Sequence, residues 1–306
     1  WPDHDDQFIL WNNGRLGISS QSVGGDPKTF PDVPWLPRAQ GFTVQFAAGP
    51  APNPPLPEFG QGNVRQSLED GYRLVTTSQW SESGVQIQQT SFAYPLDGET
   101  PHTGIEPMVG WNRVSLSSRT ARTAWLVIEF TDTDAITYMK PHPLTGLNRI
   151  TWQPGGFFLD GRLIAAADRA LTFEALPTAE GRRQFRAAVP LKPGVSAAYD
   201  FGILYRPIAA ERLKDVQAIG FTQAHARHKR YWDHLTARGA AITVPDPWLN
   251  NLYRTFFPRV LQCSHIDPDG HPVLHTSPVF YSRVWSHITA LGIAGAAGLP
   301  VLKPEP

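Results

Sequence analysis

Four carboxylate side chains near the end of the sequence are the first candidates for chemistry: Asp246, Asp267, Asp269 and Glu305. Acid–base hydrolysis by carboxylates needs two carboxyl groups that face one cleft at a set separation. Asp246, however, precedes Pro247, and such a pair is typical of the N-cap and first residue of a helix. Asp267 and Asp269 belong to the turn sequence DPDG. We therefore assign no catalytic residue within this chain.

Imidazole and carboxylate groups also gather around that turn, where His265, Asp267, His271 and His275 lie within eleven residues. Groups of this kind can bind zinc. The segment is rich in proline, which disfavours the helix that would place two ligands on one face. We interpret it as a solvated loop or the edge of a substrate site, and we expect neither a metal nor a cofactor.

Nucleophilic and nucleotide-dependent chemistry find little support. The one cysteine, Cys263, excludes an internal disulfide and a multi-cysteine metal site. No local feature marks it as an activated nucleophile, and a small buried cysteine is the commoner case. The sequence contains no G-x-S-x-G motif and no glycine-rich phosphate-binding loop.

The composition narrows the class of protein and its partners. The 27 basic and 27 acidic residues balance, without a basic block or acidic tail, which argues against a nucleic-acid or anionic-membrane partner. No apolar run approaches the length of a membrane span. The chain starts at Trp1 without Met and shows no signal peptide, so we interpret the start as processed or incomplete and leave localisation open. Ten Trp residues hint at carbohydrate, because indole rings stack on sugars, although most Trp residues are core.

The elements that must position any site are strands for the first two thirds of the chain. Residues 85–90 alternate apolar and polar side chains, the period of a half-buried strand. Residues 123–130 are apolar enough for a central strand, and Asp160-Gly161 predicts a hairpin turn. Twelve to fifteen such strands up to about residue 205, with no helical pattern between them, predict a large antiparallel sandwich.

A helical pattern begins after Pro207. Residues 209–236 contain no proline, and His228, Tyr231, Trp232 and Leu235 form one amphipathic stripe, while Gly220 is a point where the helix can break. We interpret the basic run at residues 225–230 as a solvated face rather than a binding patch.

The last segment, residues 241–306, is predicted to be helical around its polar loop. Its first helix starts at Asp246-Pro247 and carries an apolar face made of Trp248, Leu249, Leu252, Phe256 and Val260. One helical hairpin cannot bury its own apolar face. Either a larger helical domain continues from it, or it docks elsewhere.

This order of parts resembles the six-hairpin glycosidases, that is, the glucoamylase-like, glycogen-debranching-like and disaccharide-phosphorylase-like enzymes. The matching stretches are WNNGRLG, SLEDGY with RLVTTSQW, the Tyr231-Trp232 linker end with VPDPWLNNLYR, DPDG leading to Tyr281 and RVW, and ALGIAGAAGLP. The resemblance implies a mainly β chain with C-terminal helices, in which a β-super-sandwich domain (1–207) precedes a helical linker (208–240). Residues 241–306 would then be the start of an incomplete (α/α)6 barrel.

The resemblance also implies where sugar would bind. If the last helix is the first inner helix of the barrel, its N-terminal end opens on the sugar cleft, and the substrate-binding residues are Tyr281, Arg283, Trp285 and His287. Otherwise Trp285 is a core residue and Arg283 an exposed linker residue. Many family members have Arg-Asp after the barrel Trp, whereas this chain has Ser286-His287-Ile288, which puts one sugar-binding carboxylate in doubt.

We therefore expect the N-terminal portion of a carbohydrate-active enzyme, glycoside hydrolase-like and acting on an oligo- or polysaccharide, whose catalytic carboxylates lie downstream of this chain. The alternative is a non-enzymatic carbohydrate-binding or scaffold module that is complete as it stands. The expected partners are a carbohydrate ligand and either the remainder of the barrel or a partner subunit that covers the terminal helices. A plain adhesion sandwich is disfavoured because it leaves the helical linker unexplained.

Overall fold

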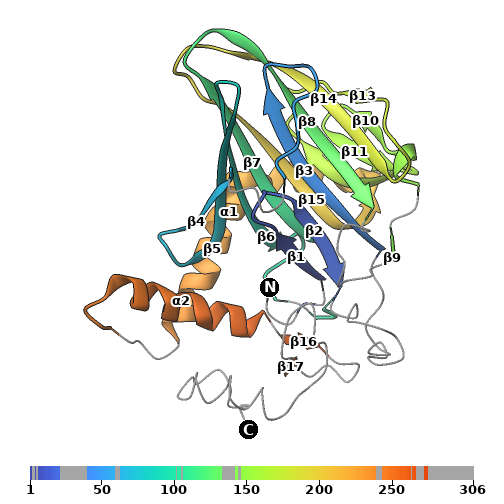
Figure 1. Cartoon of the computed structure of the whole chain (residues 1–306). Coiled ribbons are helices and arrows are strands. Elements are labelled where there is room, and N and C mark those ends of the chain that lie inside the picture. The colour runs from blue at the N-terminus through green and yellow to red at the C-terminus, as the bar shows by residue number, and fades with distance from the viewer. Residues whose placement is uncertain are drawn as a thin grey trace.

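The computed structural model describes residues 1, 4, 6–20, 40–58, 63–100, 102–104, 106–132, 142–143, 146–238, 243–262, 264–266 and 272–274. Two large antiparallel sheets face each other, and two helices follow them, α1 (Leu213–Ala237) and α2 (Pro247–Leu261) (Figure 1). The mainly β fold with C-terminal helices that the sequence pattern predicts is therefore confirmed.

The first sheet has seven strands, in the order β1-β2-β3-β8-β14-β13, with β9 pairing in parallel to β3. Their bounds are Asp6–Leu10 (β1), Leu16–Ser20 (β2), Gln40–Gly49 (β3), Arg122–Asp132 (β8), His142–Pro143 (β9), Glu174–Leu176 (β13) and Arg182–Leu191 (β14).

The second sheet has eight strands, in the order β10-β11-β12-β15-β7-β6-β5-β4. Their bounds are Arg65–Glu69 (β4), Arg73–Glu82 (β5), Val85–Pro95 (β6), Met108–Ser118 (β7), Thr151–Gln153 (β10), Gly156–Leu159 (β11), Arg162–Ala167 (β12) and Ala197–Ala209 (β15). Two short 3-10 helices, Leu147–Arg149 and Ala210–Arg212, precede β10 and α1.

The strand signals in the sequence correspond to elements of these sheets. Val85, Ile87 and Gln89 on β6 are buried and the residues between them exposed, as the alternation predicts. The apolar run at 123–130 lies in β8, between β3 and β14 in the middle of its sheet. The β11–β12 hairpin turns through Asp160 and Gly161, both at positive φ.

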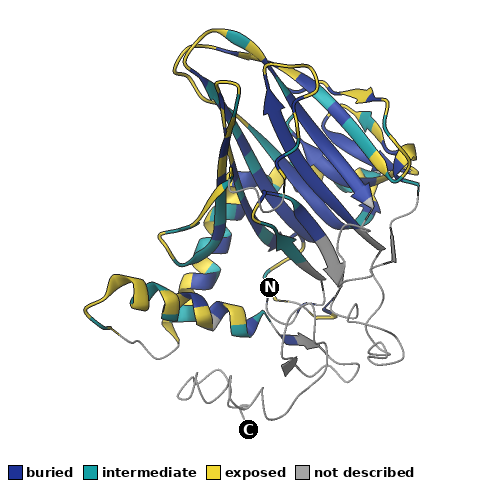
Figure 2. Ribbon diagram, viewed as in Figure 1, coloured by how far each residue is buried: buried dark blue, intermediate teal, exposed yellow. Residues whose placement is uncertain are grey.

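Aromatic side chains from both sheets fill the space between them. Phe130 of β8 lies 5.3 Å from Phe157 of β11, measured between ring centroids, and Phe157 lies 5.0 Å from Phe185 of β14. Phe46 of β3 and Phe201 of β15 pair in the same way at 4.9 Å. All five rings are at most 1% exposed, so this layer is one continuous core, visible as the dark interior in Figure 2.

Helix α1 lies on the outer face of the eight-stranded sheet. Its buried residues include Val216 and Phe221, and the Phe221 ring lies 5.2 Å from Phe92 of β6. Gly202 of β15 permits the close approach, because a Cβ atom there would lie 3.0 Å from Cγ1 of Val216. The helix is therefore a third layer on the sandwich rather than a free connector.

Two sets of charged contacts join α1 to the turn between β4 and β5. Glu69 accepts hydrogen bonds from His225 at 2.7 Å and from Lys229 at 2.9 Å. Arg73 pairs with both Asp70 and Asp233. Burial alone would raise the pKa of Glu69, but its bonds to Lys229 and His225 outweigh burial and lower it. The sheet edge and the helix are thus held together by ion pairs as well as by packing.

The expectation that residues 225–230 form a solvated face is wrong for His228, which is only 3% exposed. His228 lies four residues from both Ala224 and Trp232, so it is on the helix face that packs against the sheet. His225 and Lys229, on the adjoining side of the helix, are engaged by Glu69. The basic run is therefore largely a docking surface within the chain.

Helix α2 follows at an angle to α1 and contacts β5, and the short hairpin of β16 (Ser264–Ile266) and β17 (Pro272–Leu274) follows it (Figure 1). None of the helices in the described part of the chain has the length and apolarity that crossing a bilayer requires.

Candidate functional site

The residues predicted to contact sugar, Tyr281, Arg283, Trp285 and His287, lie outside the described residues, so their role stays a prediction. The same holds for the other side chains considered for chemistry in the terminal segment, namely Cys263, Asp267, Asp269, His271, His275 and Glu305. Within the ranges that the structure describes, no group of three or more His, Cys, Asp or Glu side chains is placed to hold a metal ion.

Asp246 has the structural use that its sequence context predicts. Its carboxylate accepts a hydrogen bond of 2.8 Å from the backbone N–H of Trp248, and Pro247 is the first residue of α2. Asn250 adds a second brace at this end, because its side-chain amide bonds to both the N–H and the C=O of Val244, each at 2.8 Å. The start of α2 is therefore fixed by local contacts, and Asp246 is occupied by capping.

Helix α2 exposes a large apolar face. Four large hydrophobic side chains on it are exposed: Trp248 (66%), Leu249 (45%), Leu252 (52%) and Phe256 (44%). Val195 is the one other large hydrophobic residue that is exposed in the described part of the chain. Beside this face, a groove of about 590 Å³ runs between α2 and the β4–β5 turn. In Figure 2 much of the α2 ribbon is yellow, the colour of exposed residues, whereas the strands of the sandwich are mostly dark blue. Contiguous exposed apolar side chains of this kind are typical of contact surfaces.

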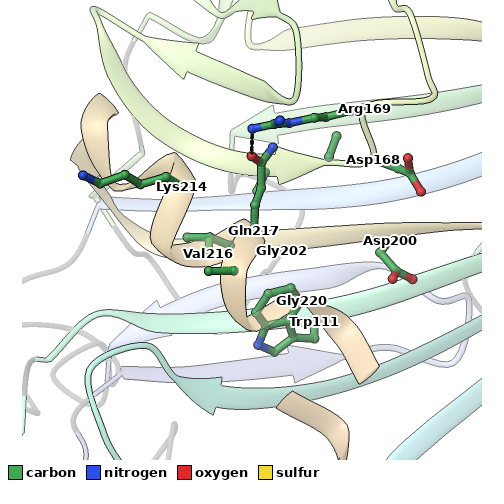
Figure 3. A pocket seen from close by; sticks show the side chains of 12 residues that line it. Trp111, Asp168, Arg169, Asp200, Gly202, Lys214, Val216, Gln217 and Gly220 are labelled. Carbon is green, nitrogen blue, oxygen red and sulfur yellow. Dashed lines mark hydrogen bonds between the residues drawn. The ribbon is translucent and has the colours of Figure 1, made fainter. Parts of the chain in front are cut away.

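A second hollow, of about 510 Å³, lies between α1 and the outer face of β7, β12 and β15 (Figure 3). Its apolar lining comes from small side chains and one indole, whereas its polar lining comes from both carboxylates and cations. The residues concerned are Trp111, Ala166, Ala167, Asp168, Arg169, Asp200, Gly202, Lys214, Val216, Gln217, Ala218 and Gly220. We call this hollow the α1 cavity.

The polar side chains of the α1 cavity are held in place by neighbours. Arg113 donates two hydrogen bonds to Asp200, at 2.7 and 2.9 Å, and a third to the hydroxyl of Thr222 at 3.1 Å. The pairing with Asp200 raises the pKa of Arg113. On the other side, Arg169 donates to the amide oxygen of Gln217, as Figure 3 shows. The side chains of Asp200, Arg169 and Gln217 are therefore fixed in orientation by contacts within the chain.

Two further features of the α1 cavity are unusual. Gly220 interrupts α1 with φ 61° and ψ 165°, a backbone conformation that is essentially restricted to glycine. Trp111 is 3% exposed, and its indole N–H has no hydrogen-bond partner among the described residues. An unpaired buried donor is costly. Of these features, the sequence signalled only the break at Gly220.

Comparison with known proteins shows a broad similarity in structure and no match in sequence. No model of a protein family and no curated protein matches the sequence. Among solved structures, the chain is similar to a protein from the human microbiome described as a kojibiose phosphorylase, with 10% identity, a TM-score of 0.48, and coverage of 87% of this chain and 43% of that one.

It is also similar to two family GH92 enzymes of Bacteroides thetaiotaomicron. The inverting mannosidase has 11% identity, a TM-score of 0.29, and coverage of 90% of this chain and 39% of its own. The α-mannosidase has 11% identity, a TM-score of 0.27, and coverage of 89% and 41%. These structural neighbours are carbohydrate-active enzymes, and the chain spans less than half of the length of each.

Proposed function

We propose that this chain is the N-terminal portion of a carbohydrate-active enzyme, glycoside hydrolase-like and acting on an oligo- or polysaccharide. In this proposal the sandwich and α1 brace an (α/α)6 barrel that begins with α2. The catalytic carboxylates belong to later barrel helices, and Tyr281, Arg283, Trp285 and His287 contact sugar at the mouth of the barrel.

The exposed apolar face of α2 is the observation that carries this proposal. Burying a Trp, Leu or Phe side chain contributes roughly 1.5–3 kcal/mol, and α2 leaves four such side chains exposed. The cap at Asp246 and the brace by Asn250 fix where this helix starts. A helix that is anchored at one end and apolar along one side is suited to pack against further helices, as the first helix of a barrel does.

The contacts of α1 support a bracing role for the sandwich. The ion pairs of Glu69 and Arg73 fix α1 to the β4–β5 turn, and α2 packs beside that same turn at Tyr72, whose carbonyl accepts a hydrogen bond of 3.3 Å from Thr255. A barrel that begins with α2 would therefore be supported by α1 and the β4–β5 turn, whose contacts with each other are already formed.

The second candidate is a carbohydrate-binding module without catalysis. The α1 cavity favours it, because a preformed hollow with oriented polar groups can bind a ligand without any barrel. The two candidates differ in whether catalysis appears when more of the coding sequence is expressed.

The test compares residues 1–306 with the same chain extended by the coding sequence that follows Pro306. Both proteins are assayed for hydrolysis and, with added phosphate, for phosphorolysis of a panel of α-linked glucosides and mannosides. We expect turnover from the extended protein and none from residues 1–306. Turnover by residues 1–306 alone would overturn the proposal, and so would a reading frame that closes at Pro306.

A further inference from the structure

We propose that the α1 cavity is a binding site for a neutral mono- or disaccharide, separate from any barrel site. The inference deepens the second candidate function, whose cavity it uses, and it does not rest on the barrel proposal, because every group that it uses lies in the sandwich or in α1. It assigns a separate ligand to the sandwich and α1, the part of the molecule that would brace a barrel.

Size and lining fit a sugar. Small-molecule sites in proteins enclose roughly 300–1,000 Å³, and the α1 cavity has about 510 Å³. Part of its wall is apolar, formed by the buried side chains of Ala166, Ala167 and Val216 and by the exposed Ala218. A pyranose ring has an apolar face in its C–H groups, and its hydroxyls lie around the rim where polar side chains can reach them.

Charges of both signs surround the cavity. Two carboxylates, Asp168 and Asp200, and two cations, Arg169 and Lys214, line it, and Asp200 is already paired with a third cation, Arg113. A cationic ligand would meet Arg169 and Lys214, and an anionic ligand would meet Asp168, which is unfavourable in a partly desolvated hollow. Hydroxyl groups both donate and accept hydrogen bonds, so a polyol can satisfy carboxylates and cations at the same time.

The polar groups are preorganised. Gln217 accepts from Arg169 and donates to the carbonyl oxygen of Gly155 at 3.4 Å, so its amide is held from both sides. Asp200 is held by the two hydrogen bonds from Arg113. Fixing side chains before binding reduces the entropy lost when a ligand arrives, which is the property expected of a built site.

The bend in α1 at Gly220 and the unpaired indole of Trp111 both lie in the wall of the α1 cavity. A continuous helix would not need the glycine-only conformation at Gly220, and a Cβ atom there would meet nothing within 4 Å. Gly220 lines the cavity, so the bend shapes part of its wall. Trp111 lies on the β7 side of the cavity, and its indole N–H is unpaired among the described residues and fully buried, so the ring senses a ligand through the cavity wall and not by a hydrogen bond to it.

The experiment records the tryptophan indole N–H signals of the isotopically labelled chain by NMR while sugars are added. The neutral probes are glucose, mannose, maltose and cellobiose, and the charged probes are glucuronate and inorganic phosphate. The Trp111 signal is assigned from the Trp111→Phe variant. We expect a saturable shift of this signal with at least one neutral sugar. No saturable shift with any neutral sugar, or a shift with charged probes alone, overturns the proposal.

A matched pair of variants locates the site. Arg169→Ala with Gln217→Ala removes one guanidinium and one amide from the cavity, and we expect binding to weaken about tenfold or more. Arg65→Ala with Gln79→Ala removes the same two groups from a separate polar groove of about 560 Å³ on β4–β7. Binding that persists in the first variant but is lost in the second places the sugar in that groove and overturns the proposal. Thermal unfolding of both variants verifies that they fold.

Discussion

At the scale of single residues, His228 shows how burial sets the charge of a group. Its ring lies 5.1 Å from Phe92 and 6.3 Å from Trp232, measured between centroids, and it is 3% exposed. Desolvation is the largest cause that lowers its pKa, and positive charge at His225 and Arg73 adds to it, so the pKa falls from 6.5 to about 3. The folded protein therefore holds this imidazole neutral through the whole neutral and mildly acidic range.

This shift predicts a loss of stability in acid. Because the unfolded chain binds a proton near pH 6.5 and the folded chain only near pH 3, stability is full above pH 6.5 and falls as pH decreases between these values. Between pH 7 and pH 5, the free energy of unfolding of the unsubstituted protein should fall as His228 resists protonation in the folded state. We expect the free energy of unfolding of His228→Phe to fall by about 2 kcal/mol less over the same range. Urea unfolding at both pH values measures this difference. Equal losses in both proteins would show that His228 is not the group responsible.

Asp246 allows a second test at this scale. Replacing it with Ala removes the acceptor for the Trp248 N–H and is expected to destabilise the first turn of α2 by about 1 kcal/mol. Hydrogen exchange of the Trp248 amide should then be about fivefold faster. Asp246→Asn retains a side-chain oxygen and serves as the control. Unchanged exchange in Asp246→Ala would contradict the assignment of Asp246 as a cap.

At the scale of elements, the contact of α1 with the sheet depends on Gly202. A Cβ atom at this position would lie 3.0 Å from Val216, 3.1 Å from Val109 and 3.4 Å from Trp111, all of them buried. We expect Gly202→Ala to reduce the free energy of unfolding by about 1–3 kcal/mol, because the crowded side chains must move.

A double-mutant cycle separates this crowding from other effects. Val216→Ala removes the nearest methyl groups, so the double variant should be more stable than the sum of the two single changes predicts, by at least about 0.5 kcal/mol. Chemical denaturation of the four proteins gives the coupling. Strict additivity would show that α1 does not press on the sheet at Gly202.

The same scale shows what local sequence determines. The alternation at Val85 to Gln89, the Asp160-Gly161 turn and the Asp246-Pro247 start all depend on neighbouring residues, and each was predictable. The order of strands was not, because β15 pairs with β7 and β12, whose residues are distant in sequence. The burial of His228 also depends on the sheet beneath α1, so the local charge pattern wrongly predicted that this residue lies on a solvated face.

At the scale of the whole molecule, the α1 cavity shows why a hollow of this kind is not visible in the sequence. Trp111, Asp168, Asp200 and Gln217 come from three strands or strand ends and a helix, and they meet only because the sheet order brings β7, β12 and β15 under α1. None of them forms a motif with its sequence neighbours. Gly220 alone gave a local signal, and a glycine within a helical pattern has many meanings.

The exposed face of α2 makes a prediction about how the whole molecule behaves in solution. With Trp248, Leu252 and Phe256 exposed, residues 1–306 should self-associate at moderate concentration, because contact between molecules removes this apolar surface from water. Changing all three residues to Gln should shift the chain toward monomer without loss of the sandwich. Sedimentation velocity measures the first effect, and thermal unfolding verifies the second.

Val195→Gln is the matched control, because Val195 is exposed at 55% but lies in the turn before β15, away from α2. It should leave association unchanged, since a single exposed side chain offers little area to a second molecule. If the chain without substitutions is monomeric and unfolds cooperatively, its apolar face needs no further helices, and the self-contained carbohydrate-binding module becomes the better account. Association that only the α2 substitutions reverse would instead identify α2 as a contact surface, as both a continuing barrel and a partner subunit require.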